Sequence, residues 1–246
     1  LVTNGDLRLA LAPGQWDPLP VVGERRTQLR APGVPEVVVP LRFADKGLGY
    51  SIRVWAEGEA LFLAVDLDEA LSAEDAANLG FNLELYPAAL FEKSYQLGAA
   101  FGVFPRQNNG PLVYDAQGKL QLTPLAKGEK LVIAAEDPRL HCDVIRSGGE
   151  LELYDGRDTA SNGWFVLRAP LAAGTQKEAL ILQILPHRIA GWVRPPQILY
   201  SQVGFHPQGE KRFLIELDPA RRHAQPREAI LEAFQADGRI TPFATA

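Results

Sequence analysis

The sequence lacks methionine, has a single cysteine and contains no long uninterrupted apolar run. Cys142 stands alone, so the chain cannot form an internal disulfide, and paired-cysteine metal or redox motifs are excluded. Because Cys142 lies in an alternating segment, residues 140–144, we expect a buried structural thiol rather than a nucleophile. No apolar segment approaches the length of a membrane-spanning helix, so no membrane span is predicted.

Positive charge is also scarce. The 246 residues include 25 Lys and Arg against 30 Asp and Glu, which gives a net charge of −5. Nucleic-acid binding needs a basic surface to neutralise phosphates, so we expect no nucleic-acid partner. The four histidines are scattered, and no Ser-His-Asp order, His-Glu-x-x-His motif or Gly-rich phosphate loop is present. We therefore expect no cofactor or metal. Since position 1 is not methionine, we expect the chain to begin inside a longer polypeptide.

Alternation of apolar and polar residues with a period of two dominates what is present. This pattern predicts strands at residues 37–43, 50–55, 60–66, 81–86, 131–134, 150–154, 164–167 and 179–185. Gly, Pro, Asn and Asp separate these strands at short intervals. We therefore predict an all-β fold, an antiparallel β-sandwich.

Only residues 72–79 carry the pattern of a helix. Ser72 is placed as the N-cap, acidic residues occupy the first turn, and Gly80 is placed to end the helix. Further along the chain, Pro195 and Pro196 predict a domain boundary, because two adjacent prolines interrupt any strand. Residues 1–194 are expected to form a large β-sandwich domain, and residues 197–246 to begin a second domain.

The second domain opens with a recognisable stretch. Residues 201–207 read Ser-Gln-Val-Gly-Phe-His-Pro, and Lys211 then leads into an apolar strand. This resembles the start of the immunoglobulin-like domain of family 9 glycoside hydrolases, where Asn-Gln-Val-Gly-Tyr-x-Pro opens the first strand. Ser201 and Phe205 depart from that pattern, mildly in shape but not in hydrogen bonding. Gly204 fits a backbone conformation that excludes a Cβ, and Pro207 fits the start of a turn.

The first domain carries a fainter resemblance. Residues 80–87, 91–95 and 102–111 are similar to the β-sandwich that precedes the immunoglobulin-like domain in some bacterial members of that family. An immunoglobulin-like fold usually needs about 100 residues. We therefore expect residues 197–246 to be only the N-terminal, truncated part of such a domain.

The resemblance implies a function for the whole chain. It would be the non-catalytic N-terminal portion of a cellulase-like glycoside hydrolase that acts on β-glucan-type polysaccharide. Its partners would be the C-terminal catalytic domain of the same polypeptide, which it braces, and an oligosaccharide or polysaccharide. The family carries its catalytic acids on a barrel of helices that this chain lacks, so no catalytic residue is assigned. A periplasmic or secreted location is favoured. A stand-alone carbohydrate-binding or adhesive β-sandwich protein is the alternative.

The best candidate for carbohydrate binding is the loop at residues 101–111. Sugars are held by aromatic faces together with planar polar groups, and this loop offers Phe104, Arg106, Gln107 and Asn108. The alternative interpretation is a turn built on Asn109-Gly110 with aromatic packing beside it.

Residues 155–164 form the other polar loop, which ends at Trp164. The ring of Trp164 is a candidate surface for stacking against a sugar, and the alternative is a core residue of a strand. Asp155, Asp158 and Asn162 offer oxygen ligands for calcium, but Arg157 intrudes and no Glu completes the set. We therefore predict a plain surface turn. The acids Glu84, Glu92 and Asp155 are predicted to face solvent from strands or turns.

Overall fold

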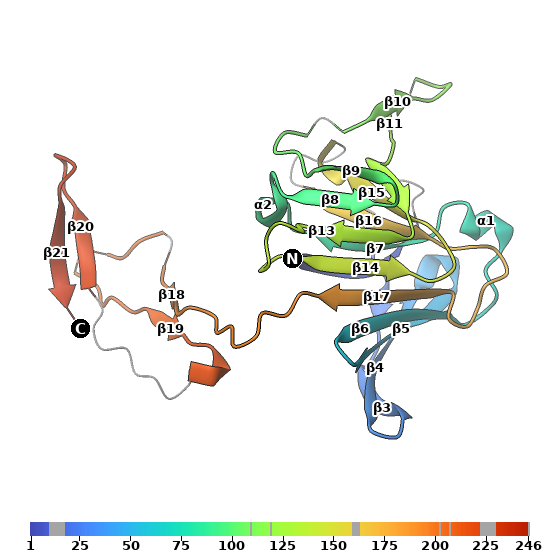
Figure 1. Ribbon diagram of the computed structural model, residues 1–246, viewed down its shortest axis with the longest axis horizontal. Coiled ribbons are helices and arrows are strands. Elements are labelled where there is room, and N and C mark those ends of the chain that lie inside the picture. The colour runs from blue at the N-terminus through green and yellow to red at the C-terminus, as the bar shows by residue number, and fades with distance from the viewer. Residues whose placement is uncertain are drawn as a thin grey trace. The chain divides into compact units, whose positions relative to one another are not determined.

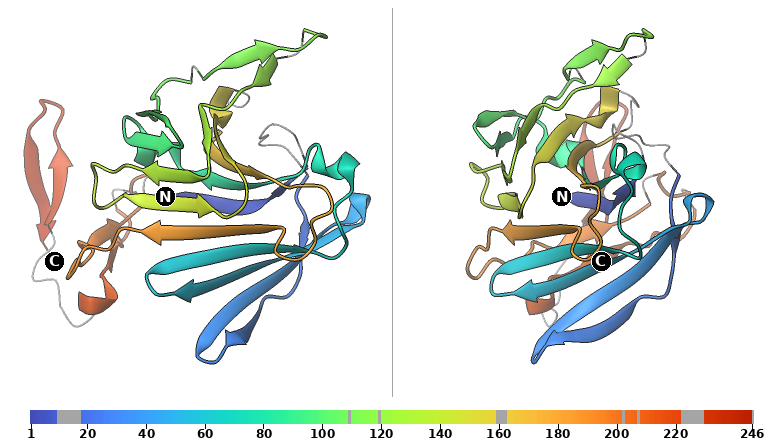
Figure 2. Two further views of the ribbon diagram at one scale, coloured as in Figure 1. Left: turned by 45° about the vertical axis from the view of Figure 1, so that its right-hand side comes forward. Right: turned by 90° about the vertical axis from the view of Figure 1, so that its right-hand side faces the viewer.

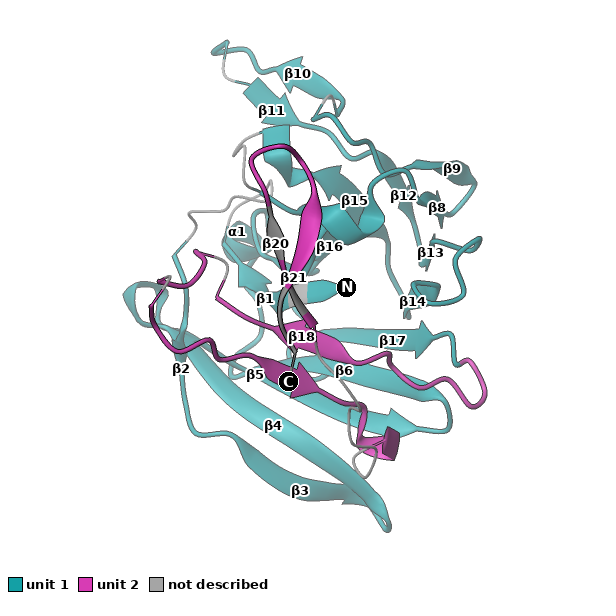
Figure 3. Cartoon of the chain, turned by 90° about the vertical axis from the view of Figure 1, so that its left-hand side faces the viewer, with its two compact units in different colours: residues 1–188 teal, residues 189–246 magenta. Residues whose placement is uncertain are grey.

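A computed structural model describes residues 1–9, 18–108, 110–118, 120–158, 163–201, 203–206, 208–221 and 230–245 (Figure 1). The chain divides into two compact units, Leu1–Arg188 and Ile189–Ala246 (Figure 3). Pro195 and Pro196, the predicted boundary, lie inside the second unit. The strands of both units pair in antiparallel fashion, which confirms the predicted all-β class.

Unit 1 is an antiparallel β-sandwich whose described residues form a smaller and a larger sheet (Figure 2). The smaller sheet has the strand order β1 (Val2–Arg8), β7 (Gly80–Leu85), β16 (Phe165–Pro170), β15 (Leu151–Asp155) and β12 (Ala126–Gly128). The larger sheet has the order β2 (Val21–Val22), β4 (Val34–Phe43), β5 (Leu48–Glu57), β6 (Ala60–Leu67), β17 (Leu180–Pro186), β14 (Cys142–Arg146), β13 (Lys130–Ile133), β8 (Ser94–Leu97) and β9 (Ala100–Val103), with β3 (Arg26–Ala31) paired to β4.

The core lies between the two sheets, and the period-two alternation explains which side chains fill it. Along β6, Leu63, Val65 and Leu67 point into this core, and Leu83 and Leu85 of β7 belong to the same cluster. The predicted strands are all present, with ends shifted by a few residues. Cys142 is buried as predicted, and burial raises the pKa of its thiol to about 11, so the thiol is protonated and unreactive at neutral pH.

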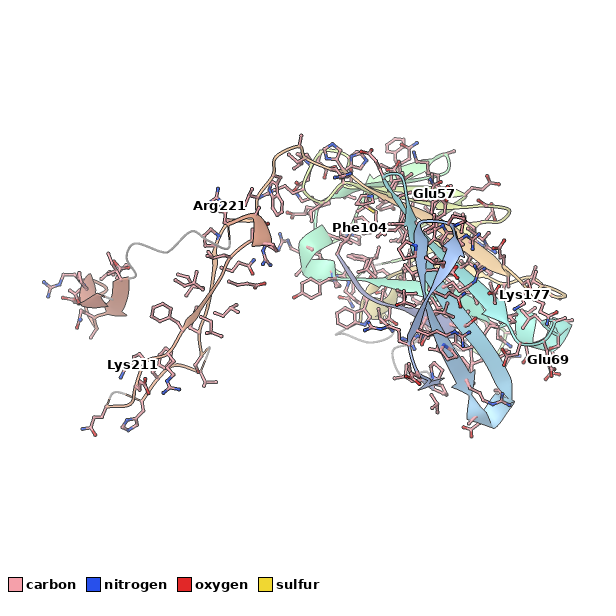
Figure 4. The ribbon with its side chains drawn as sticks, turned by 90° about the horizontal axis from the view of Figure 1, so that it is seen from below. Glu57, Glu69, Phe104, Lys177, Lys211 and Arg221 are labelled. Carbon is pink, nitrogen blue, oxygen red and sulfur yellow. The ribbon has the colours of Figure 1, made fainter. Side chains whose placement is uncertain are left out.

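The larger sheet joins strands that are far apart in the sequence. Leu63 of β6 pairs with Leu182 of β17. The segments that lead out of β6 and into β17 are also bonded, because Gln176 Nε2 donates to the carbonyl oxygen of Asp68 at 2.8 Å. Figure 4 accordingly shows Glu69 and Lys177 at the same end of the unit.

The predicted helix is shorter than the sequence pattern indicates. The structure has a single turn, α1 (Ala73–Ala76), and Ser72 caps it as predicted, with its Oγ accepting from the amide of Asp75 at 3.0 Å. The prediction that Gly80 ends the helix is wrong, because Gly80 is the first residue of β7. A Cβ on Gly80 would lie 2.6–2.9 Å from the guanidinium of Arg168, so glycine is needed there to admit this fully buried side chain.

The remaining elements of unit 1 are short connections. They are η1 (Ala44–Lys46), α2 (Pro87–Leu90), η2 (Gly156–Asp158) and the hairpin of β10 (Leu112–Tyr114) and β11 (Leu120–Leu122). This hairpin extends away from the rest of the unit (Figure 1). No helix among the described residues has both the length and the apolar character needed to cross a membrane.

The described part of unit 2 consists of separate hairpins. β18 (Gln197–Leu199) pairs with β19 (Leu214–Glu216), and β20 (Ile230–Phe234) pairs with β21 (Ile240–Thr245); η3 (Pro219–Arg221) follows β19. Gly204 has a φ of 84°, in the left-handed region that the sequence predicted for it. Gln202 and Pro207, which belong to the family-like stretch, lie outside the described residues. Large apolar side chains of these hairpins are exposed, including Val203 at 99% and Leu214 at 71%.

Candidate functional site

The two polar loops predicted from the sequence, at residues 101–111 and 155–164, contact each other in the structure. Arg157 joins them. Its Nη1 donates to the carbonyl oxygen of Arg106 at 2.9 Å, and its Nη2 donates to that of Pro105 at 2.7 Å. A longer bond of 3.4 Å reaches the carbonyl oxygen of Gln107. Consecutive backbone carbonyls of the 101–111 loop are therefore fixed by one buried guanidinium.

Arg157 is itself held in place on two sides. Its Nε and Nη2 donate to the two carboxylate oxygens of Asp155 at 2.8 and 2.7 Å. Its guanidinium also lies 4.5 Å from the ring centroid of Phe165 and 5.1 Å from that of Phe91. A buried charge is stable only when it is paired and hydrogen-bonded, and both conditions are met here.

Asp158 fixes the far end of the same loop. Its Oδ2 accepts from the backbone amide of Gly110 at 2.9 Å. Burial raises the pKa of Asp158, and the negative charge of Asp155 raises it further, against the opposing effect of the Gly110 amide. The turn at residues 155–158 therefore supports the loop through a guanidinium and a carboxylate. This role of Arg157 and Asp158 was not predicted from the sequence.

The predicted sugar-contacting residues divide into two groups in the structure. Arg106, Gln107 and Asn108 are exposed, and Arg106 Nη2 lies 3.1 Å from Glu92 Oε2. Phe104, by contrast, is fully buried among the side chains of unit 1 (Figure 4), with ring centroids 5.2 Å from Tyr95 and 4.9 Å from Phe165. The aromatic ring of the loop therefore packs in the core and has no face available to a ligand. Asn109 lies outside the described residues.

Trp164 lies at the other side of the 155–158 turn. Its carbonyl oxygen accepts from the amide of Gly156 at 2.9 Å, and its half-buried ring packs on a small cluster of Leu122, Tyr154 and Val166. The ring centroid of Tyr86 is 6.3 Å away, and Tyr86 is 48% exposed. Tyr86, the second member of this aromatic pair, was not predicted from the sequence as a site residue.

The acidic side chains of this region form ion pairs with arginines. The prediction that Glu84 and Asp155 face solvent is wrong: both are buried, Glu84 against Arg8 at 2.5 Å and Asp155 against Arg157. Glu92 is exposed as predicted, and its hydrogen bond and charge interaction with Arg106 lower the pKa of its carboxyl. Asn162 lies outside the described residues, which contain no group of three His, Cys, Asp or Glu arranged to hold a metal.

The site is thus a polar loop whose described backbone is bonded to Arg157 and Asp158, with an aromatic pair beside its supporting turn, carried on an antiparallel β-sandwich. Comparison of the chain with known protein families and with curated proteins finds no match.

Proposed function

We propose that this chain is the non-catalytic N-terminal portion of a glycoside hydrolase that acts on β-glucan-type polysaccharide. In this proposal unit 1 is the accessory sandwich, and unit 2 is the beginning of an immunoglobulin-like domain. The observation that supports carbohydrate contact is the fixed backbone beneath Arg106 and Gln107. A backbone that is already fixed adds no ordering cost of its own when a ligand binds, so only the side chains of Arg106 and Gln107 must be ordered, which favours recognition of hydroxyl groups.

The arrangement of the acids supports a non-catalytic role. Glycoside hydrolysis needs two carboxyl groups on opposite sides of the scissile bond, one of which acts as an acid. Glu84 and Asp155 are buried in ion pairs, and the pKa of the exposed Glu92 is lowered by Arg106, which opposes an acid role.

A bracing role is supported by apolar side chains on the surface of unit 1. Phe101 and Val103 of β9 are 84% and 59% exposed, and Leu112, Val113 and Tyr114 of β10 are exposed as well. Exposed apolar residues on neighbouring positions of a strand are typical of protein contact surfaces. In the proposal, the C-terminal catalytic domain of the same polypeptide covers such a surface.

Affinity electrophoresis in gels that contain cellulose-type or mixed-linkage β-glucan tests the carbohydrate contact. The double substitution Arg106→Ala and Gln107→Ala should remove the retardation of the chain and leave its melting temperature unchanged. The matched control is Arg139→Ala with Gln117→Ala, which removes an exposed Arg and an exposed Gln elsewhere on unit 1. Equal retardation of both double variants, or none for the unaltered chain, contradicts the loop as a sugar site.

The non-catalytic assignment has its own test. The purified chain should release no reducing sugar from the same glucans. Turnover that disappears on substitution of one acid within the chain would contradict the assignment. The reading frame beyond Ala246 separates the proposal from a stand-alone binding or adhesive protein: a helical region rich in Asp and Glu supports the former, and further β repeats support the latter.

A further inference from the structure

A second group of aromatic and charged residues lies on the other face of the larger sheet, remote from the core. Along β5, Ile52 and Val54 pack on the core, so the alternate residues Arg53 and Trp55 face outward. Trp55 stacks on its cross-strand neighbour Phe62, with ring centroids 5.3 Å apart and an interplanar angle of 9°. Glu57, labelled in Figure 4, marks the end of the same strand.

The outer face of Trp55 is covered by a guanidinium from the chain itself. The central carbon of the Arg30 guanidinium, on β3, lies 3.9 Å from the ring centroid of Trp55. Its Nη1 and Nη2 lie 3.4 Å from carboxylate oxygens of Glu36 and Glu178. A cation on an indole face with carboxylates beside it is the composition of a cation-binding site.

The group contains more carboxylates than guanidinium groups. Glu36, Asp66 and Glu178 all bond to Arg53, at 2.9, 2.7 and 3.0 Å. Burial acts to raise the pKa of Glu36 and Asp66, but hydrogen bonds and the Arg53 charge outweigh it and lower both. Glu36 and Asp66 are therefore ionised at neutral pH, and Lys177 adds a further positive charge near Asp66.

Backbone geometry holds Glu178 in this arrangement. Its φ of 48° lies in the left-handed region, which is unfavourable for a residue with a side chain. Its amide donates to Asp66 Oδ1 at 2.8 Å. A strained residue persists where its surroundings determine its position, and such residues cluster at binding sites.

Arg30 is the most easily displaced member of the group. Its ion-pair distances of 3.4 Å are the longest in the group, and its side chain is 32% exposed against 13% for Arg53. All side chains of β3 are exposed, so the strand contributes nothing to the core. Trp55 is only 5% exposed, yet its Nε1 has no hydrogen-bond partner among the described residues. A guanidinium has no acceptor for this N–H, so the part of the indole that Arg30 covers, and that a ligand would contact, is the ring face.

We propose that Trp55, Glu36 and Glu178 form a binding site for a guanidinium-bearing ligand, and that Arg30 closes this site from within the chain. An incoming guanidinium takes the place of the Arg30 guanidinium on the indole face and between the two carboxylates. This inference is independent of the carbohydrate loop, which involves none of these residues.

The test uses the full chain and two probes of nearly the same shape, N-acetyl-arginine amide and the uncharged N-acetyl-citrulline amide. Isothermal titration calorimetry should show that Arg30→Ala binds the arginine probe at least tenfold more tightly than the unaltered chain. The citrulline probe should bind at least tenfold more weakly to the same variant. Arg26→Ala removes another exposed Arg of β3 and should behave as the unaltered chain does.

Two further variants locate the probe. Adding Trp55→Leu or Glu178→Gln to Arg30→Ala should each weaken binding of the arginine probe by at least tenfold, with circular dichroism confirming the fold. If Arg30→Ala does not fold, Arg30→Gln takes its place, since it keeps a long polar side chain without the charge.

Binding can also be measured on the unaltered chain, without substituting Arg30. Millimolar arginine probe should shift the indole NH resonance of Trp55, assigned by its loss in Trp55→Phe, and the citrulline probe should not. The proposal would be overturned if a folded Arg30→Ala or Arg30→Gln variant bound both probes with equal affinity. It would also be overturned if that variant bound the arginine probe no more tightly than the unaltered chain does. An unmoved indole resonance would overturn it as well.

Discussion

The guanidinium of Arg157 and the carboxylate of Asp155, two residues apart, face each other at 2.7 Å with side chains only 7% and 0% exposed. The same guanidinium holds the carbonyl oxygens of Pro105 and Arg106, some fifty positions earlier in the chain. One buried ion pair thus connects the end of β15 to the surface loop proposed to contact sugar.

Removing this guanidinium should destabilise unit 1 strongly. Arg157→Ala leaves the Asp155 carboxylate buried without its partner, and the loop carbonyls lose their donors. Breaking one side of a buried pair typically costs about 3–5 kcal/mol. Urea unfolding followed by tryptophan fluorescence should show a loss of this size. Arg106→Ala, which removes an exposed guanidinium nearby, is the control and should leave the urea midpoint unchanged. A similar midpoint for both variants would contradict the supporting role of Arg157.

Gly80→Ala should also destabilise unit 1, by about 1–3 kcal/mol. The added Cβ would lie 2.6–2.9 Å from the guanidinium of Arg168, which is fixed by a bond of 2.9 Å to Asn82 Oδ1. Gly209→Ala is the matched control, because the nearest atom to its Cβ is at an ordinary contact distance of 3.4 Å. Equal melting temperatures for the two variants would show that Arg168 has room to move.

Asp6 should make the chain less stable as the pH rises, whereas an acid in a salt bridge makes a protein less stable as the pH falls. Burial raises its pKa above the ordinary value of 3.8, although Tyr50 Oη and the Leu7 amide donate to its carboxylate. A raised folded-state pKa gives stability that is complete below the unfolded value and is lost as the pH rises through the folded value. Ionised Asp6 therefore costs stability at neutral pH.

Asp6→Asn keeps an oxygen acceptor for both donors and removes this charge. The variant should melt at a higher temperature than the unaltered chain at pH 7, and the difference should shrink as the pH approaches 4. Differential scanning calorimetry across this range measures the effect. A difference that is constant with pH would rule out Asp6 as its source.

Amide hydrogens of unit 2 should exchange much faster than those of β5 and β6. A two-stranded hairpin is marginally stable alone, and apolar side chains such as Val203 and Leu214 are exposed rather than packed. Hydrogen–deuterium exchange with mass spectrometry compares peptides from β18 and β19 with peptides from β5. Equal protection would show that unit 2 is independently stable.

Much of the fold of unit 1 follows from alternation alone, and the departures have clear physical causes. Alternation predicts strand positions because each strand has one face on the core. It does not tell which polar residue will be buried against a distant partner. Glu84 is buried because β1 brings Arg8 beside it, and Asp155 because Arg157 turns back over it.

The candidate site was predictable only in part. The polar character of residues 106–108 is evident from the sequence, and these side chains are exposed. Phe104, in the same loop as these residues, is instead buried in the core against Tyr95 and Phe165. The contact of Arg30 with Trp55 depends on the pairing of β3 with β4 and of β4 with β5, which no local pattern specifies.

The pairing of β6 with β17 has a consequence for how the molecule forms. Neighbours such as β4, β5 and β6 are joined by short turns, so these hairpins can assemble early at little entropic cost. Leu63 and Leu182, in contrast, meet only after the intervening chain has been brought into a loop. Folding rates fall as such long-range pairings increase, and we expect unit 1 to fold in about milliseconds to seconds. Until β17 docks, β6 is an open edge, so the late formation of this ladder lengthens the interval during which the nascent sheet is vulnerable to aggregation.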